Sequence, residues 1–228
     1  MTGLCGLCRQ PGELQESHLL PRAGYRHLQG CKTGVQWDPV FTTPKKARIT
    51  PGQATASFLC SDCEQRFHKR GEAPILRQCL HRDGRFWLRE QLEAAAPLHH
   101  ERRSTVYDAV PLLGRAIDSY LYFAASVFWR SAAYRRWRGG RESVASIPLG
   151  ATYQEQFRLY LLDQAPFPTN ARISLHVATE RDLDVLLTLQ FPSSARLNDL
   201  HCHDFFINGL LFVLFLGKAV PLDTVIKP

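Results

Sequence analysis

Two Cys-x-x-Cys pairs, at positions 5–8 and 60–63, have the residue type and spacing of zinc ligands. Each turn places two thiolates on one knuckle, and two such turns complete the four-sulfur tetrahedral coordination that structural zinc prefers. A closed four-cysteine site leaves no coordination position for a substrate. The sequence therefore predicts a structural zinc ion and a functional segment between the two pairs. The predicted ligands are Cys5, Cys8, Cys60 and Cys63.

A histidine and several carboxylates lie beside these pairs. His18 follows Glu16 and Ser17 between the pairs, and Glu64 comes directly after the second pair. Histidine is suited to general base catalysis near neutral pH, and carboxylates suit Mg²⁺ or Mn²⁺. Glu64 and His68 are four residues apart and would share one face of a helix. Such a base and cation are what phosphodiester hydrolysis requires.

The stretch from Cys5 to Arg22, together with Phe58 to Glu64, resembles the zinc-knuckle branch of the HNH endonucleases. The matching features are the two Cys-x-x-Cys pairs and a His-x-x-Pro sequence, within about residues 5–72. The resemblance implies a ββα-metal finger acting as a metal-dependent DNA endonuclease, with His18 as the general base. It also implies one Mg²⁺ or Mn²⁺ ion held by Glu64, with His68 as a further catalytic candidate.

The motif departs from the family pattern at three positions. Ser17 stands where the family often has an acidic residue or histidine, Glu64 stands where Asn or His is usual, and Thr55 lies near the position of the middle Asn. The alternative is therefore a non-catalytic zinc-knuckle module that binds nucleic acid or protein. In that case His18 would only hydrogen-bond its loop, and Glu64 and His68 would form a solvated helix pair. Glu72 is a third candidate ligand.

The composition favours a polyanionic partner. The chain has 228 residues, a net charge of +7 and 28 basic residues, of which 22 are Arg. The planar Arg fork suits phosphate, so we expect contact with DNA. Two groups of cations are candidate phosphate ligands, and a third group mixes cations with an aromatic ring. They are Lys45, Lys46 and Arg48; Arg66, Lys69 and Arg70; and Arg135, Arg136, Trp137 and Arg138.

The remaining features predict a cytoplasmic protein without a membrane segment. Cys31, Cys79 and Cys202 are scattered, which is not the pattern of a secreted disulfide framework. The N-terminus has no signal-peptide pattern, and the apolar run 205–220 is too short to span a bilayer. His201, Cys202, His203 and Asp204 could chelate a metal, but the start of a strand is the simpler interpretation.

The spacing of apolar and turn-forming residues predicts an α+β protein in two domains. Residues 1–92 would form the zinc-knuckle ββα-metal finger, and residues 104–228 an α+β accessory domain that binds a protein partner or a second copy. Stand-alone HNH-like proteins with an extra domain resemble antiphage (antiviral) defence effectors. We expect helices at 63–69, 110–134 and 153–162, strands at 57–60, 84–88, 172–179 and 184–191, a hairpin at 205–216 and a long loop at 33–53.

Overall fold

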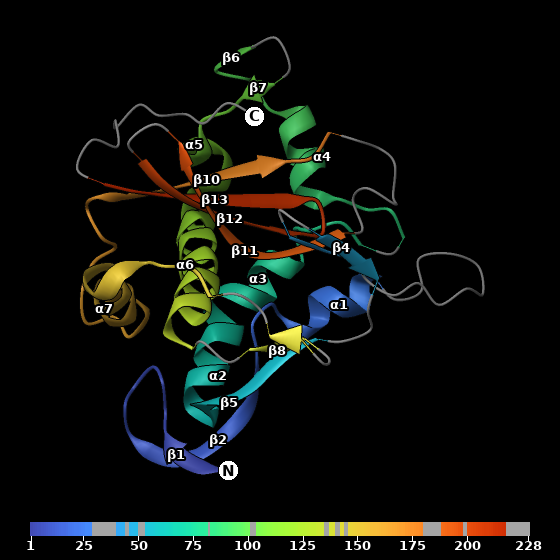
Figure 1. Cartoon of the computed structure of the whole chain (residues 1–228). Coiled ribbons are helices and arrows are strands. Elements are labelled where there is room, and N and C mark those ends of the chain that lie inside the picture. The colour runs from blue at the N-terminus through green and yellow to red at the C-terminus, as the bar shows by residue number, and fades with distance from the viewer. Residues whose placement is uncertain are drawn as a thin grey trace.

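The computed structural model describes residues 1–28, 40–43, 46–49, 53–81, 83–100, 104–134, 137–139, 142–143, 146–179, 188–197 and 200–217. The predicted α+β class is confirmed: the structure combines helices with two larger sheets, and helix α6 (Ile117–Ala133) runs between the N-terminal hairpin and the second sheet (Figure 1). Among the described residues, no helix is long and apolar enough to cross a membrane.

The first sheet carries the N-terminal hairpin. Its strands lie in the order β1-β2-β5-β8-β9. They are β1 (Thr2–Leu4), β2 (Pro11–His18), β5 (Ala54–Cys60), β8 (Arg138–Gly139) and β9 (Glu142–Ser143). β2 and β5 are antiparallel, and β5 leads directly into helix α2 (Ser61–Phe67). The predicted strand before the second cysteine pair is therefore confirmed. The helix begins two residues earlier than predicted, at Ser61, with Cys60 at its N-cap.

The helix that follows the second cysteine pair is longer than predicted. α2 continues through a π-helical segment, η1 (His68–Glu72), into α3 (Ala73–Leu76). The predicted end at residue 69 is wrong: the helix continues through Gly71, which packs closely on α6, because a Cβ there would lie 3.0 Å from the Cα of Phe123. Pro74 follows and has no N–H to donate to the carbonyl of Arg70, which explains a change of helical register at this point.

Helix α6 (Ile117–Ala133) runs through the middle of the molecule and is buried along most of its length. It packs on η1 and on α7 (Gly150–Leu161), and its Phe123 and Phe128 rings contact Phe205 (Figure 1). The predicted helix at 110–134 is confirmed with a break, because α5 (Ala109–Leu113) and a 3₁₀ turn, η2 (Gly114–Ala116), precede α6. The predicted helix at 153–162 corresponds to α7.

The second sheet has the strand order β10-β13-β12-β11-β3-β4. Its strands are β10 (Ala171–Val177), β13 (Leu210–Leu216), β12 (Leu200–Ile207), β11 (Thr188–Leu197), β3 (Val40–Thr43) and β4 (Lys46–Ile49). The predicted hairpin is confirmed, with positive φ at Asn208 (47°) and Gly209 (85°). The predicted strand at 172–179 is confirmed too. Of the predicted strand at 184–191, residues 184–187 lie outside the described residues.

Two of the predicted elements are wrong. Residues 84–88 do not form a strand: Phe86 makes one bridge with Leu80, and helix α4 (Trp87–Ala94) follows. The Glu90 carboxylate accepts a hydrogen bond from the Phe86 N–H, which favours the helical start. The loop expected at 33–53 contains the β3–β4 hairpin, because β3 pairs in parallel with β11. A small sheet joins β6 (His99–His100) and β7 (Thr105–Val106), and α1 (Arg22–Leu28) follows β2.

The ranges predicted as two domains are interleaved. β3 lies in the second sheet, β8 pairs with β5 in the first, and one core cluster includes buried residues of both ranges. Whether 1–92 and 104–228 fold separately stays a prediction. The apolar faces of the 205–216 hairpin belong to this core, since Phe205, Ile207, Leu210, Phe212 and Leu214 are fully buried.

Candidate functional site

The four predicted zinc ligands form one group. The sulfur atoms of Cys5, Cys8, Cys60 and Cys63 all lie within 4.8 Å of one another. The sulfurs of Cys8 and Cys60 are 3.9 Å apart, close to the separation of about 3.8 Å in a regular tetrahedron with Zn–S bonds of about 2.3 Å. The group is consistent with a structural zinc site and closes the N-terminal hairpin onto the start of α2.

Hydrogen bonds within the cysteine group favour the thiolate of Cys5. The Cys60 N–H donates to the sulfur of Cys5 at 3.3 Å. A hydrogen bond with Cys63 and backbone hydrogen bonds at Cys60, Cys8 and Leu7 lower the pKa of Cys5 to about 4, against the opposite effect of burial. Because the thiolate is the form that binds metal, the local geometry fits zinc.

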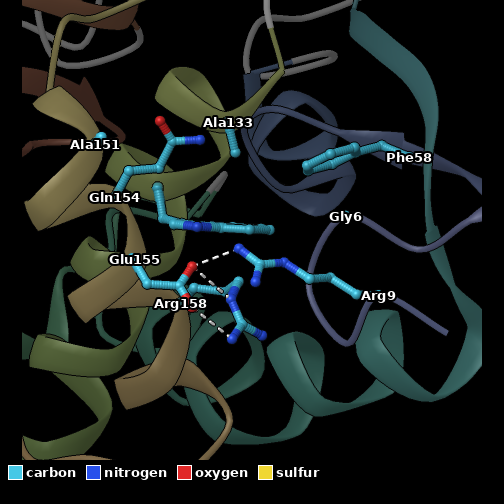
Figure 2. A pocket seen from close by; sticks show the side chains of 9 residues that line it. Gly6, Arg9, Phe58, Ala133, Ala151, Gln154, Glu155 and Arg158 are labelled. Atoms are coloured by element: carbon cyan, nitrogen blue, oxygen red, sulfur yellow. Dashed lines mark hydrogen bonds and ion pairs between the residues drawn. The ribbon is translucent and has the colours of Figure 1, made fainter.

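The first knuckle is also held against helix α7, as Figure 2 shows. Arg158 forms an ion pair with Glu155 at 2.8 Å, and Arg9 pairs with the same carboxylate. Arg158 also donates to the carbonyl of Leu7, at 2.9 Å. These side chains border a cavity of about 420 Å³ whose lining includes Phe58. The knuckle therefore depends on α7 as well as on its own sulfurs.

His18 is the last residue of β2 and lies opposite Thr55 in the ladder with β5. Its side chain is half-buried, and burial is the main cause that lowers the pKa of His18. The charges of Arg22 and Arg130 lower it as well, whereas Glu16 and Glu72 act in the opposite sense. The neutral imidazole, which can accept a proton, is therefore favoured at neutral pH.

Glu64 lies on α2 and is turned inward. Burial raises the pKa of Glu64, while the Arg130 charge and a hydrogen bond with Ser17 lower it. Its Oε1 is buried and has no hydrogen-bond partner among the described residues. Ser17 is therefore close to Glu64, and one carboxylate oxygen is left for a ligand.

Arg130 is a site residue that the sequence did not reveal. Its side chain is only 1% exposed and donates to the carbonyl of His18 at 2.7 Å, and it pairs with Glu72 at 3.0 Å. Glu72, at the end of the π-helical segment, is 13% exposed. The signal available in the sequence was a single Arg inside the otherwise uncharged stretch 119–134.

His68 lies at the rim of this group. Its side chain is 64% exposed, and its Nδ1 lies 4.0 Å from Oε2 of Glu72. In the part of the chain that the structure describes, one group of three or more His, Cys, Asp or Glu side chains has its ligand atoms within 4.8 Å of one another, and it is the group of four cysteines. The structure therefore brings His18, Glu64 and Glu72 into one charge network but does not close a three-ligand metal site with His68.

Two of the predicted phosphate ligands have protein partners. Arg66 and Arg70 both form ion pairs with Asp163, and Arg70 stacks over the ring of Tyr122. Lys69 is exposed. The side chains of Lys45, Lys46, Arg48, Arg135, Arg136 and Arg138 lie outside the described residues.

The candidate cluster at 201–204 is part of strand β12, as the simpler interpretation predicted. His203 is 1% exposed and its Nδ1 lies 2.8 Å from the Ser194 hydroxyl, whereas His201 is exposed. The Asp204 carboxylate accepts hydrogen bonds from the side chains of Gln190 and Ser193 instead of sharing a ligand site with the histidines.

The fold and the site define an α+β protein with a four-cysteine group consistent with zinc binding. No protein-family model, no curated protein and no solved structure matches the chain.

Proposed function

We propose that the β2–β5–α2 unit is a metal-dependent endonuclease site that hydrolyses DNA phosphodiester bonds. One observation supports the proposal: the half-buried His18, which favours the neutral form, and Glu64, whose buried Oε1 is unpartnered among the described residues, both feel the charges of Arg130 and Glu72. Both residues lie on a hairpin and helix joined by the cysteine group. His18 would take the proton from the attacking water.

The residues fit a loosely held hard cation better than a closed metal site. Mg²⁺ is commonly bound by one or two carboxylates together with water and substrate phosphates. Glu64 would supply such a carboxylate, and the bound cation would neutralise charge on the leaving oxygen. The exposed His68 fits this role less well than the buried Glu64. The cysteine group would hold a structural zinc ion.

The net charge of +7 supports a nucleic-acid substrate. The partner-binding role of residues 104–228 and a setting in antiphage defence belong to the same proposal, and they depend on the resemblance described above. The charge would concentrate the protein on DNA, whereas chemistry would be confined to the His18 site.

A second candidate function is a non-catalytic zinc-knuckle module. The Glu72 carboxylate is already paired with Arg130, and the cysteines are the one compact ligand group among the described residues. Such a module would bind nucleic acid or protein and leave the substrate intact.

A plasmid-nicking assay with Mg²⁺ or Mn²⁺ separates the two functions. Zinc-loaded wild-type protein should nick DNA, and His18→Ala should reduce the rate by about 100- to 10,000-fold because the general base is lost. Glu64→Gln should also reduce it. His201→Ala, at an exposed histidine on β12, is the matched control. Wild-type protein that binds but never cleaves DNA or RNA, or a fully active His18→Ala variant, would favour the second function.

A further inference from the structure

Arg130 joins three separate elements at the candidate site. From α6, its Nη1 donates to the backbone carbonyl of His18 at 2.7 Å and its Nη2 lies 3.0 Å from Oε1 of Glu72. Its Nε donates to the carbonyl of Ser126 in the preceding turn of α6, at 3.3 Å. One guanidinium group therefore fixes the end of β2, the end of the π-helical segment and α6 relative to one another.

The surroundings of Arg130 leave it little freedom. The side chain is 1% exposed, and its guanidinium carbon lies 5.2 Å from the centre of the Phe67 ring. The Trp137 indole N–H donates to the Arg130 carbonyl at 3.0 Å, so the backbone is held too. A buried guanidinium must have its charge and its N–H groups matched by acceptors. Here two of the acceptors, the His18 carbonyl and the Glu72 carboxylate, belong to the His18 site, and Ser126 of α6 supplies the others.

The π-helical segment sets where the carboxylate meets this arginine. Glu64 and Glu72 are eight residues apart, which is 80° out of phase in a regular α-helix. A π-helical turn takes up more residues than an α-helical turn, so it reduces this offset. Both carboxylates act on the same arginine: Glu72 by direct contact, and Glu64 through its charge. A π-helical turn is a frequent feature of functional sites.

We propose that Arg130 is a positioning residue for His18: it holds the His18 backbone at a fixed place beside Glu72, so that α6 completes the site. This inference rests on the proposed function of His18. Arg130 is too buried to contact a substrate, and its effect is transmitted through the two groups that it binds. The reaction unit therefore extends beyond residues 1–92.

Charge supports the same role. The positive charge of Arg130 lowers the pKa of His18, in the same sense as Arg22, while Glu16 and Glu72 oppose it. A fixed cation at this place favours the unprotonated imidazole that a general base needs. The geometry carries the inference, and this electrostatic effect acts in the same direction.

The test compares Arg130→Lys with Arg158→Lys in the full-length, zinc-loaded protein. Both arginines are buried and donate to a backbone carbonyl, but Arg158 holds Leu7 in the first knuckle. Lysine keeps the charge and loses the planar fork that reaches two partners at once. Two readouts are needed: kcat and KM for plasmid nicking, and the imidazole NMR resonances of His18, assigned with His18→Gln.

We expect Arg130→Lys to lower kcat by about 100-fold with little change in KM, because a misplaced base slows chemistry more than binding. The His18 resonances should move in this variant and stay in place in Arg158→Lys. A folded Arg130→Lys variant with unchanged kcat and unchanged His18 resonances would overturn the inference.

Glu72→Gln keeps the proposal testable if Arg130→Lys does not fold. It removes one partner of the guanidinium at a partly exposed position, and it should move the His18 resonances and lower kcat by about 10-fold. Unchanged resonances and kcat would overturn the inference. If wild-type protein lacks nuclease activity, the proposed function fails, and the His18 resonances alone then decide whether Arg130 positions this residue.

Discussion

The cysteine group and the His18 site share one hairpin and one helix, but they are assembled in different ways. All four cysteines come from two short segments, and their ligand atoms converge within 4.8 Å. His18 and Glu64 come from the same stretch of chain, yet the cation that bonds the His18 carbonyl is Arg130, 112 residues further along. The metal ligands come from two short motifs that can be recognised separately, although Cys8 and Cys60 are 52 residues apart. A buried charged site requires a counter-charge from wherever the fold brings one.

The largest expected effect is the loss of the cysteine group. Cys63→Ser should abolish stoichiometric zinc binding, and since metal affinity contributes directly to folding, it should lower stability by up to about 10 kcal/mol. Metal analysis of the purified protein and thermal unfolding with and without chelator would measure this.

The matched control for this prediction is Cys79→Ala. Cys79 is fully buried and lies outside the cysteine group. This variant should keep its zinc while losing some packing energy. Equal zinc content in Cys63→Ser and wild type would show that the cysteine group does not hold the zinc, and the contrast between the cysteine group and the His18 site would no longer hold.

The sequence predicted the cysteine group and its hairpin but not the Arg130 part of the His18 site, for a physical reason. Ligand spacing is a local property, so the two Cys-x-x-Cys pairs, the strand into the second pair and the Asn208-Gly209 turn were all identifiable. The contact between Arg130 and His18 depends on how α6 crosses the hairpin. No periodicity in either segment encodes that crossing.

Burial is the main cause of the lowered pKa in both His18 and His203. His203 lies outside the His18 site, so it provides a comparison for the effect of burial. Burial lowers the pKa of His203 to about 4, from a usual value of 6.5. Folding then opposes protonation, so stability is full above pH 6.5 and falls as pH drops from 6.5 towards 4. The loss should approach about 3 kcal/mol.

Denaturant unfolding at pH 7, 5.5 and 4.5 would measure this loss. His203→Gln should reduce the pH dependence relative to wild type, whereas His201→Gln, at an exposed position, should change it only slightly, since burial is a larger cause of the lowered pKa of His203 than the charge of His201. Protonation of the cysteines contributes equally to all three proteins and cancels in the difference. An unchanged pH dependence in His203→Gln would mean that this histidine is not held neutral by burial.

Gly71→Ala should have a smaller effect on stability, and it should affect the His18 site without affecting the cysteine group. Added at Gly71, a Cβ would lie 3.0 Å from the Cα, 3.1 Å from the N and 3.2 Å from the Cβ of Phe123, so α6 must shift. We expect a loss of about 2 kcal/mol, or roughly 4–8 °C in Tm, with zinc content unchanged. The His18 resonances should move because Arg130 shifts with α6.

Gly12→Ala is the control for this variant, since a Cβ at Gly12 would have no other atom within 4 Å. It should change stability by less than about 0.5 kcal/mol. Loss of zinc from Gly71→Ala would show that the cysteine group and the α6 crossing form one cooperative unit.

Elements with weak local signals were the ones the sequence misassigned. The β3–β4 hairpin lies in a stretch rich in turn-forming residues, and its place in the sheet depends on pairing with the distant β11. Phe86 and Trp87 have strand propensity, but the hydrogen bond from the Phe86 N–H to Glu90 favours a helix. In the first case a long-range strand pairing decides the structure, and in the second a local capping contact outweighs strand propensity.

The smallest expected effect is at the surface of the first knuckle. Arg9 and Glu155 are 61% and 40% exposed, so solvent screens their ion pair, and Arg9→Ala should lower stability by less than about 1 kcal/mol. Arg158 would still bind the Leu7 carbonyl, and Arg158→Ala should cost more because that bond is buried. Urea unfolding at low and high salt would measure both variants. If Arg9→Ala destabilised the protein as strongly as Cys63→Ser, the surface ion pair would stabilise the first knuckle as much as the cysteine group does. The contrast between the cysteine group and the rest of the site would then be wrong.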